Sequence, residues 1–345
     1  MNLTDLKLTD LGERRILKEI IPKFVSGAGD DCSITSLANG FLVSTMDPVP
    51  MPAAQAIGGS DDPYFAGWLL VTINASDIAA SGATPQTFLA SFDMPRDWPV
   101  SSLERLMKGI RESCQMQGLE YVGGNIRESN KFVATGVANG FCPTKPLTRS
   151  GAESGSRLLV FGESGKFWSD VLDFKAGRIV DKALSPLFQP VSQSQNMHFL
   201  HERGLLQCAM DTSDGLAPTL EELASKNHLG LLIDTQQIKD HSQQLTSLER
   251  PERLWMGWGD WTVAAAVSPS RIQEVHRTCA DRGVLATEIG EFTDSKVGVY
   301  LEDGGVRIAL GRLESERFAK DSWFHLGIEA YEEMLRQFPL PNLPK

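Results

Sequence analysis

Carboxylate side chains beside small residues recur at four separated places in the sequence, and together they could bind a metal ion. The four segments are GAGDD, STMDP, NASDIAASGA and MDTSDGL, and their aspartates are Asp30, Asp31, Asp47, Asp77, Asp211 and Asp214. Carboxylates that converge on one pocket repel one another, and burying them is costly unless a cation is bound. The hydroxyls of Ser44, Thr45 and Ser213 lie beside them in the sequence. Oxygen ligands of this kind are typical of magnesium.

Each segment also has a purely structural explanation when it is taken alone. Asp77 interrupts an apolar helical run and could lie on a solvated stripe of that helix. Ser213 and Asp214 precede an apolar run and could cap the start of a helix. The glycines before Asp30 could belong to an ordinary surface turn. The occurrence of all four segments in one chain favours the metal site.

Alternating helices and strands must position these aspartates, and their order predicts two α/β domains. In the first part we expect helices over 9–21, 63–83 and 101–118, and strands over 41–45, 86–92, 119–124 and 131–141. In the second part we expect strands over 157–162, 229–235, 261–267 and 286–293, and helices over 167–184, 213–226 and 270–283. Residues 145–156 are rich in proline, glycine and serine and indicate the junction. The chain is therefore divided into domains 1–147 and 148–345.

The composition excludes some classes of partner. Lys and Arg number 33 against 44 Asp and Glu, a net charge of -11, which argues against nucleic acid or an anionic membrane as the main partner. The five cysteines form no CxxC pair, so free thiols in a reducing cytoplasm are expected. The apolar, uncharged run 64–76 is too short to span a bilayer. We expect a cytoplasmic protein.

The order and spacing of GAGDD, VSTMD, INASDIAASGATP, YVGGN, LTRSGAESG and MDTSDGL resemble thiamine-monophosphate kinases. More broadly, the sequence is similar to the superfamily of aminoimidazole ribonucleotide synthetase, HypE and selenophosphate synthetase. The resemblance implies a two-domain α/β (α+β) fold whose amino-terminal sheet domains pair as the barrel of a homodimer. It also implies an ATP- and Mg²⁺-dependent kinase that converts ATP and thiamine phosphate into ADP and thiamine diphosphate.

The same resemblance implies roles for individual residues. Asp31, Asp77 and Asp214 would be central to catalysis. The implied metal ligands are Asp31, Ser44, Thr45, Asp47, Asp77, Asp211 and Asp214. The implied nucleotide-binding residues are Gly123, Gly124, Asn125, Arg149 and Ser213.

The acceptor side departs from the family pattern. Asn125 stands where the family has a metal-binding aspartate, and Gly259 replaces the glutamate of the acceptor site, although Asp260 is kept. The loop PVPMPAAQA lacks the family's histidine, and Trp323 takes the place of an aromatic residue that packs on thiamine. The implied substrate residues are Gly259, Asp260 and Trp323. Because this side of the site departs from the family pattern, the phosphoryl acceptor could be a small molecule other than thiamine phosphate.

Two other functions remain open at this point. The chain could be a different ATP-consuming enzyme that activates a carbonyl or amide oxygen by phosphorylation. It could also be a non-catalytic nucleotide-binding protein, which Asn125 and Gly259 would permit. Trp255, Trp258 and Trp261 either fill the core or form the wall of an aromatic acceptor pocket, and their glycine neighbours favour the pocket. His198 and His201, three residues apart, are expected to have surface or packing roles.

Overall fold

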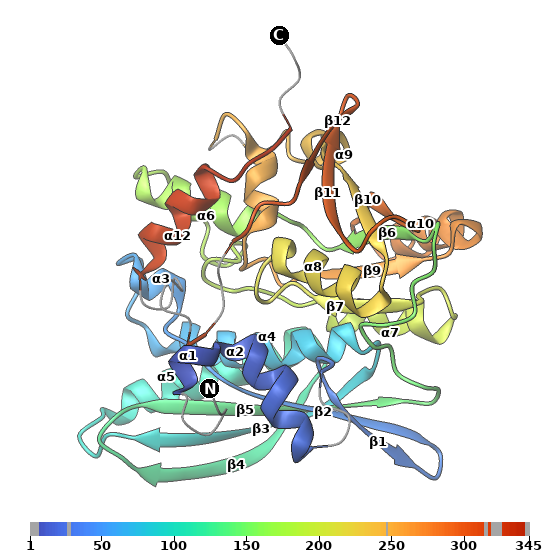
Figure 1. Cartoon of the computed structure of the whole chain (residues 1–345). Helices are drawn as coiled ribbons and strands as arrows, with labels where there is room; N and C mark the ends of the chain where they lie inside the picture. The colour runs from blue at the N-terminus through green and yellow to red at the C-terminus, as the bar shows by residue number, and fades with distance from the viewer. Residues whose placement is uncertain (1–6, 26–28, 246–247, 314–316, 319–325, 342–345) are drawn as a thin grey trace.

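Two β-sheets, one in each half of the chain, form the framework of the molecule (Figure 1). The computed structural model describes residues 7–25, 29–245, 248–313, 317–318 and 326–341. The first sheet has five strands in the order β1-β2-β5-β3-β4. These strands are β1 (Ser33–Leu37), β2 (Gly40–Pro48), β3 (Thr84–Met94), β4 (Glu120–Glu128) and β5 (Val133–Cys142). Strands β3 and β4 are parallel, and the other neighbours are antiparallel.

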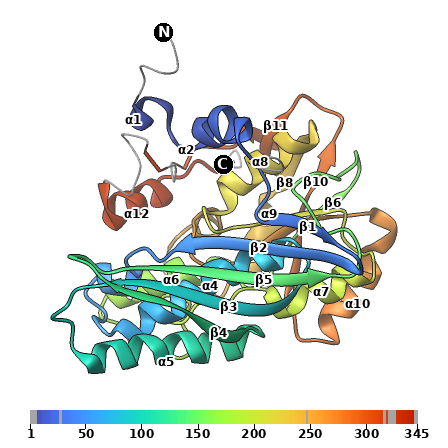
Figure 2. The ribbon, with the colours of Figure 1, turned by 90° about the horizontal axis from the view of Figure 1, so that it is seen from below.

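Helix α4 (Pro63–Ala80) lies between the first sheet and the second half of the molecule (Figure 1). Its sequence is apolar on every side, and such a helix must be covered all round. Accordingly, nearly every side chain from Tyr64 to Ala80 is buried. Helix α5 (Val100–Gln117) packs along α4, and Gly67 and Gly109 allow the two backbones to approach closely. Figure 2 looks onto the opposite face of the sheet, which no helix of the described chain covers.

The second sheet has seven strands in the order β12-β11-β8-β10-β6-β9-β7. They are β6 (Arg157–Phe161), β7 (Cys208–Asp211), β8 (Gly230–Asp234), β9 (Val263–Val267), β10 (Ala286–Thr293), β11 (Gly298–Asp303) and β12 (Val306–Ala309). Strands β8 and β11 are parallel and the remaining pairs are antiparallel, so both sheets are mixed. Strand β9 is buried at every position, because one core lies on each face of the sheet.

Helices cover both faces of this second sheet. They are α6 (Lys166–Lys175), α7 (Ser194–Glu202), α8 (Leu216–Asn227), α9 (Thr235–His241), α10 (Ile272–Ala280) and α12 (Ile328–Arg336). The core on one face includes Leu220 of α8 and Tyr331 of α12, and it continues to Phe65 and Trp68 of α4. The two halves of the chain therefore share a hydrophobic core.

Short helical turns complete the described chain. They are α1 (Leu8–Leu11), α2 (Glu13–Arg15), η2 (Ile16–Ile20), η3 (Ile21–Lys23), α3 (Ala53–Ala56), η4 (Pro251–Met256) and η5 (Pro269–Arg271). The expected single helix over 9–21 is wrong, because Gly12 adopts a φ of 73° and separates α1 from α2. The helix expected over 167–184 ends at Lys175, just before Gly177 with a φ of 75°.

Other sequence expectations can be compared directly with the structure. All five cysteines are buried and free, as predicted. Strand β5 ends at Cys142 and β6 begins at Arg157, so the predicted division at 147/148 falls in the connection between the sheets. Within the described residues, the helices are all too short or too polar to cross a bilayer.

Candidate active site

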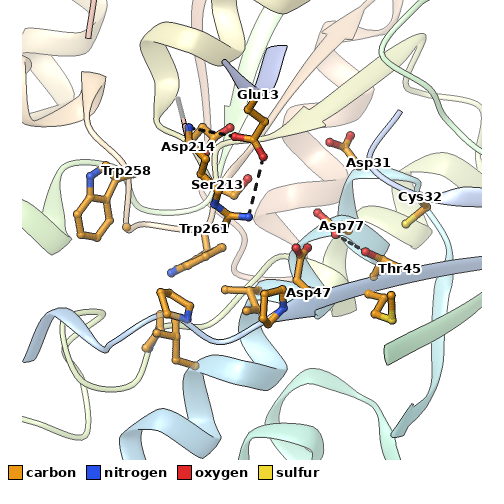
Figure 3. Close-up of a pocket in the computed structure, with 18 of the residues that line it drawn as sticks. Glu13, Asp31, Cys32, Thr45, Asp47, Asp77, Ser213, Asp214, Trp258 and Trp261 are labelled. Atoms are coloured by element: carbon orange, nitrogen blue, oxygen red, sulfur yellow. Dashed lines mark hydrogen bonds and ion pairs between the residues drawn. The ribbon is translucent and has the colours of Figure 1, made fainter. Parts of the chain in front are cut away.

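A cavity of about 650 Å³ lies between the two halves of the chain and is lined by residues from both. Figure 3 shows Asp31, Asp47, Asp77, Ser213 and Asp214 around this cavity. Segments that are far apart in the sequence thus converge here, as the repeated acidic pattern predicts.

Three carboxylates form the centre of the site. Asp31 precedes β1, Asp77 lies near the end of α4, and Asp211 is the last residue of β7. One carboxylate oxygen from each lies within 4.8 Å of those of the other two. Asp77 and Asp211 are 9% and 1% exposed, so the solvated-stripe explanation for Asp77 is wrong. Asp31, Asp77 and Asp211 together form the acidic triad.

Hydroxyl groups and one guanidinium group orient the acidic triad. Thr45 Oγ1 donates to Asp77 Oδ2, and Ser76 Oγ donates to Asp211 Oδ2 at 2.7 Å. Arg149 Nη2 lies 2.5 Å from Asp31 Oδ1, and it brings the connection between the sheets to the triad. Each carboxylate therefore has a defined direction toward the others.

The charge of the acidic triad is only partly compensated by protein groups. Burial raises the pKa of Asp31 to about 6, and Arg149 opposes this rise. Burial, together with the charges of Asp211, Asp47 and Asp31, raises the pKa of Asp77 well above its usual value. The pKa of Asp211 is also raised by burial, against hydrogen bonds from Ser76 and Ser213. Three buried carboxylates beside one arginine are the donor set that a hard divalent cation requires.

Asp47 and Asp214 flank the acidic triad from opposite domains. Asp47 is held by its backbone, because its N–H donates to Oδ1 of the buried Asn74 at 3.0 Å. Asp214 lines the cavity, where the surrounding protein and, to a lesser extent, the charge of Glu13 raise the pKa of its carboxyl to about 6. The N-cap residue of α8 is Gly215, so the side chain of Asp214 does not cap that helix. Asp47 and Asp214 thus both line the cavity.

The hydroxyl of Ser44 is not directed at the acidic triad. Because side chains alternate along a strand, Ser44 and Thr45 point to opposite faces of β2. Ser44 Oγ donates to Asn139 Oδ1 at 2.7 Å on the neighbouring strand β5. Thr45 is therefore the hydroxyl of this pair that the fold brings to the triad.

Ser44 still lines the cavity, whereas three predicted nucleotide residues lie away from it. Gly123, Gly124 and Asn125 lie on β4, at the opposite edge of the first sheet from β1. None of the three lines the cavity of this chain. By contrast, Arg149 and Ser213 do line it, and Ser213 Oγ donates to Asp211 Oδ1 at 2.9 Å.

The predicted acceptor residues have different environments. Asp260 accepts hydrogen bonds from the N–H groups of Gly165 and Phe167 at 2.6 and 2.7 Å, so it holds the amino-terminal end of α6 rather than lining the cavity. Burial raises the pKa of Asp260 to about 7. Gly259 lines the cavity with a φ of 114°, and a Cβ there would collide with the ring of Phe167. Trp323 lies outside the described residues.

Aromatic and apolar side chains form the wall on this side of the cavity. Trp258, Trp261 and Phe167 line it, together with Pro50, Met51, Pro52, Leu187 and Phe188. Trp255 is instead a core residue that is 2% exposed. The three tryptophans thus divide between the two roles that the sequence left open. His198 and His201 lie on α7, apart from the cavity lining.

Several residues of the site were missed at the level of sequence. Asn74 and Ser76 position Asp47 and Asp211, and polar residues inside an apolar helix were the signal that could have identified them. Glu13 and Arg317 also line the cavity, and they carry no such local signal.

Known proteins provide an independent comparison. The family model for the AIR synthase related protein N-terminal domain matches residues 29–142, and the model for the C-terminal domain matches residues 153–302. The thiamine-monophosphate kinase of Halobacterium salinarum is 28% identical over 315 residues, which are 91% of this chain and 100% of that protein. The thiamine-monophosphate kinase of Pyrococcus horikoshii is 26% identical over 264 residues, or 73% of this chain and 81% of that protein.

The fold is similar to solved structures as well. The structure of AaThiL complexed with AMPPCP and TMP aligns with a TM-score of 0.72, covering 86% of this chain and 95% of that one. Its sequence identity is 23%, so this likeness concerns the fold. The two sheets of this chain therefore have the arrangement found in that protein.

Proposed function

The chain belongs to the AIR synthase related family, and we propose that it is an ATP- and Mg²⁺-dependent phosphotransferase resembling thiamine-monophosphate kinases. The observation that carries the proposal is the acidic triad at the interdomain cavity, whose carboxylate oxygens lie within 4.8 Å of one another. A purely structural cluster of buried, mutually repelling carboxylates would destabilise the fold without a compensating role.

Asp31, Asp77 and Asp211 would hold magnesium, with Thr45, Asp47 and Asp214 near enough in the cavity to bind further ions or their water ligands. When bound, magnesium would neutralise the phosphate oxygens of ATP and align them for transfer. Arg149 would add positive charge on the side of Asp31. The carboxylates of the two domains would thus face one nucleotide.

The reaction would join an oxygen of the acceptor to the γ-phosphorus of ATP and break the bond from that phosphorus to the β,γ-bridging oxygen. ADP leaves with the electron pair of the broken bond. If the acceptor oxygen belongs to a phosphate anion, no proton has to be removed, and no general base is needed. The residues of the cavity then act through position and charge.

The acceptor side is the part of the proposed activity that departs most from the family pattern. Phe167 fills the space beside Gly259, where the resemblance leads one to expect a glutamate. Asp260 is bonded to the start of α6. We therefore propose thiamine phosphate as the first acceptor to test and a different small phosphate ester as the next.

A homodimer would complete the proposed site. Val122 and Ile126 of β4 are 48% and 56% exposed on a strand at the edge of the first sheet. Exposed apolar residues on an edge strand favour pairing with another chain. A dimer in which β4 of a second copy approaches the cavity would give Gly123, Gly124 and Asn125 their predicted place at the nucleotide.

The test is phosphorus NMR of the full chain with ATP, magnesium and thiamine monophosphate, beside a sample without the acceptor. Thiamine diphosphate in equal amount to ADP supports the proposal in full. ADP without thiamine diphosphate supports phosphotransfer and rejects this acceptor. An absence of ATP turnover and of magnesium-dependent binding of AMPPCP would reject the proposed function.

A further inference from the structure

The segment that carries Arg149 has no regular secondary structure of its own. Residues 143–156, between β5 and β6, form neither helix nor strand, and residues 149–152 within them form the junction turn. Ser150 and Gly151 of this turn are exposed, and Gly151 has a φ of 140°. An exposed turn that contains glycine has many accessible conformations. A group outside the turn must therefore keep Arg149 at the acidic triad.

Asn227, the last residue of α8, is bonded to the junction turn on both sides of its amide group. Its Oδ1 accepts hydrogen bonds from the N–H groups of Gly151 and Ala152, both at 2.8 Å. Its Nδ2 donates to the carbonyl oxygen of Arg149 at 2.9 Å and to that of Leu223 at 2.8 Å. A side-chain amide has two acceptor positions and two N–H donors, so all four are used here. Three of the four bonds hold the turn rather than the helix.

Helix α8 is a firm support for this contact. Its inner side is packed in the shared core, where Leu220 and Leu223 are fully buried. The helix begins directly after Asp214 and Gly215 and ends at Asn227. One packed helix therefore fixes the position of Asp214 at its start and that of the junction turn at its end.

The backbone of Arg149 is held from both halves of the chain. Its N–H donates to Asp30 Oδ1 at 3.0 Å in the first half, and its carbonyl oxygen accepts from Asn227 in the second. The guanidinium group then reaches Asp31 Oδ1 with Nη2 at 2.5 Å and Nε at 3.2 Å. Loss of the bonds from Asn227 would free one side of this residue and so widen the range of positions of its guanidinium group.

We propose that Asn227 is a positioning residue of the active site, which fixes the backbone of Arg149 so that its guanidinium group stays beside the acidic triad. Asn227 does not line the cavity, so its effect on a bound nucleotide passes through Arg149, which does. A small displacement of a group that positions a substrate is enough to weaken its action strongly. The inference rests on the proposed phosphotransferase function and adds to it a residue outside the cavity.

The test measures binding of AMPPCP to the full chain by isothermal titration at saturating magnesium. The variants are Asn227→Ala, Asn227→Ser, Arg149→Met and the double variant Asn227→Ala/Arg149→Met. The matched control is Asn196→Ala, which removes the same amide group from α7. There the amide donates to Gln193 Oε1 at 3.0 Å, away from the cavity lining. Urea denaturation shows whether each variant is folded.

Arg149→Met should bind AMPPCP at least about tenfold more weakly than the wild type, since a hydrogen bond from a charged group accounts for such a factor. Asn227→Ala should bind it about five- to tenfold more weakly, and Asn227→Ser should lie between Asn227→Ala and the wild type, because a hydroxyl keeps one donor. The double variant should match Arg149→Met within about twofold, because Asn227 then has no guanidinium group to position. Asn196→Ala should stay within about twofold of the wild type.

Wild-type affinity in Asn227→Ala or in Arg149→Met would overturn the inference. Losses that multiply in the double variant would overturn it too, since they would show that Asn227 acts on the nucleotide site independently of Arg149. Failure of the wild type to bind AMPPCP would count against the proposed function instead. Hydrogen exchange then tests the contact itself: the N–H groups of Gly151 and Ala152 should exchange at least about tenfold faster in Asn227→Ala, and unchanged exchange would overturn the hold on the junction turn.

Discussion

At the scale of single residues, the acidic triad lowers the stability of the fold, and the proposed binding of magnesium would offset this cost. Asp31, Asp77 and Asp211 are held close together by hydroxyl donors that fix their direction but do not neutralise their charge. Arg149 compensates one of the three. The free energy of unfolding of the metal-free protein is therefore lower than the same fold could have, which is common at functional sites.

Replacement of Asp77 by asparagine should separate the effect of the triad on stability from its proposed role in binding magnesium. The amide oxygen of the variant would keep an acceptor for Thr45 while one buried negative charge is removed, so the metal-free protein should become more stable by about 1–3 kcal/mol. Binding of magnesium and AMPPCP should weaken by about tenfold or more, because a charged ligand is lost. Urea denaturation and titration calorimetry measure the two quantities.

Asp240→Asn is the control for this change, because Asp240 is exposed on α9 and does not line the cavity. It should leave both quantities unchanged. An Asp77→Asn protein that binds the magnesium complex as tightly as the wild type would show that Asp77 is not a ligand.

The pH dependence of stability should carry the signature of the acidic triad. The folded-state pKa of Asp31 is about 6, above its ordinary value of 3.8, because the carboxylate is buried. Between these values the folded protein binds more protons than the unfolded chain, so this group's contribution is greatest at low pH and is lost as the pH rises through the window. Asp77 and Asp211 are shifted in the same direction.

We therefore expect the stabilising effect of Asp77→Asn in EDTA to grow from about pH 5 to about pH 7.5, and the stabilisation of the wild type by magnesium to grow over the same range. Denaturation curves across that range measure both trends. A difference between the two proteins that is independent of pH, or that shrinks as pH rises, would contradict this electrostatic account.

At the scale of elements, α4 is the part of the fold that positions the site. Asp77, a member of the acidic triad, lies on this helix. Asn74 of the same helix accepts a hydrogen bond from the N–H of Asp47, and Ser76 donates one to Asp211. Its polar side chains are compatible with burial because they are hydrogen-bonded: Thr72 Oγ1, for example, donates to the carbonyl of Pro190 at 2.8 Å. The position of Asp77 therefore depends on the packing of the whole helix.

Close packing of α4 on α5 should be sensitive to a single methyl group. A Cβ at Gly109 would collide with the carbonyl oxygen of Tyr64, so Gly109→Ala must push the two helices apart. We expect a loss of about 1–3 kcal/mol in the free energy of unfolding, measured by urea denaturation. Gln115→Ala, on the exposed side of α5, should change it by less than about 0.5 kcal/mol. Equal stability of the two variants would contradict the close approach.

At the scale of the whole molecule, the site exists only because the two halves are joined. The core that contains Leu220 and Tyr331 extends to Phe65 and Trp68 of α4, and the cavity lies beside this shared core. A hydrophobic connection of this kind favours a fixed relative position of the two sheets. The distances within the acidic triad depend on that position.

The proposed homodimer leads to a prediction at this scale. Ile126→Arg places a charge on the exposed edge strand β4, so it should convert a dimer into a monomer in sedimentation equilibrium. Glu104→Arg, an exposed change on α5, should leave the mass unchanged. A wild type that sediments as a monomer would reject the dimer, and with it the placement of Gly123 and Gly124 at a nucleotide.

The sequence by itself determined the elements with strong local patterns and the identity of the acidic segments. Helix α5 was predicted from its helical period, whereas α4 and β9 were predicted from continuous apolar runs whose lengths suit a buried helix and a buried strand. The acidic residues were predicted to form one metal site, because carboxylates that converge on a pocket repel one another unless a cation is bound. Strand β1, whose residues are all exposed, was missed for lack of such a pattern.

Only the tertiary structure decided which of these groups meet. Thr45 rather than Ser44 faces the triad, because the register of β2 sets which face each hydroxyl occupies. Asp260 is turned to the start of α6 by its bonds to the N–H groups of Gly165 and Phe167. Glu13 and Arg317 meet from opposite ends of the chain. Contacts of this kind depend on long-range packing, and no local period in the sequence encodes that packing.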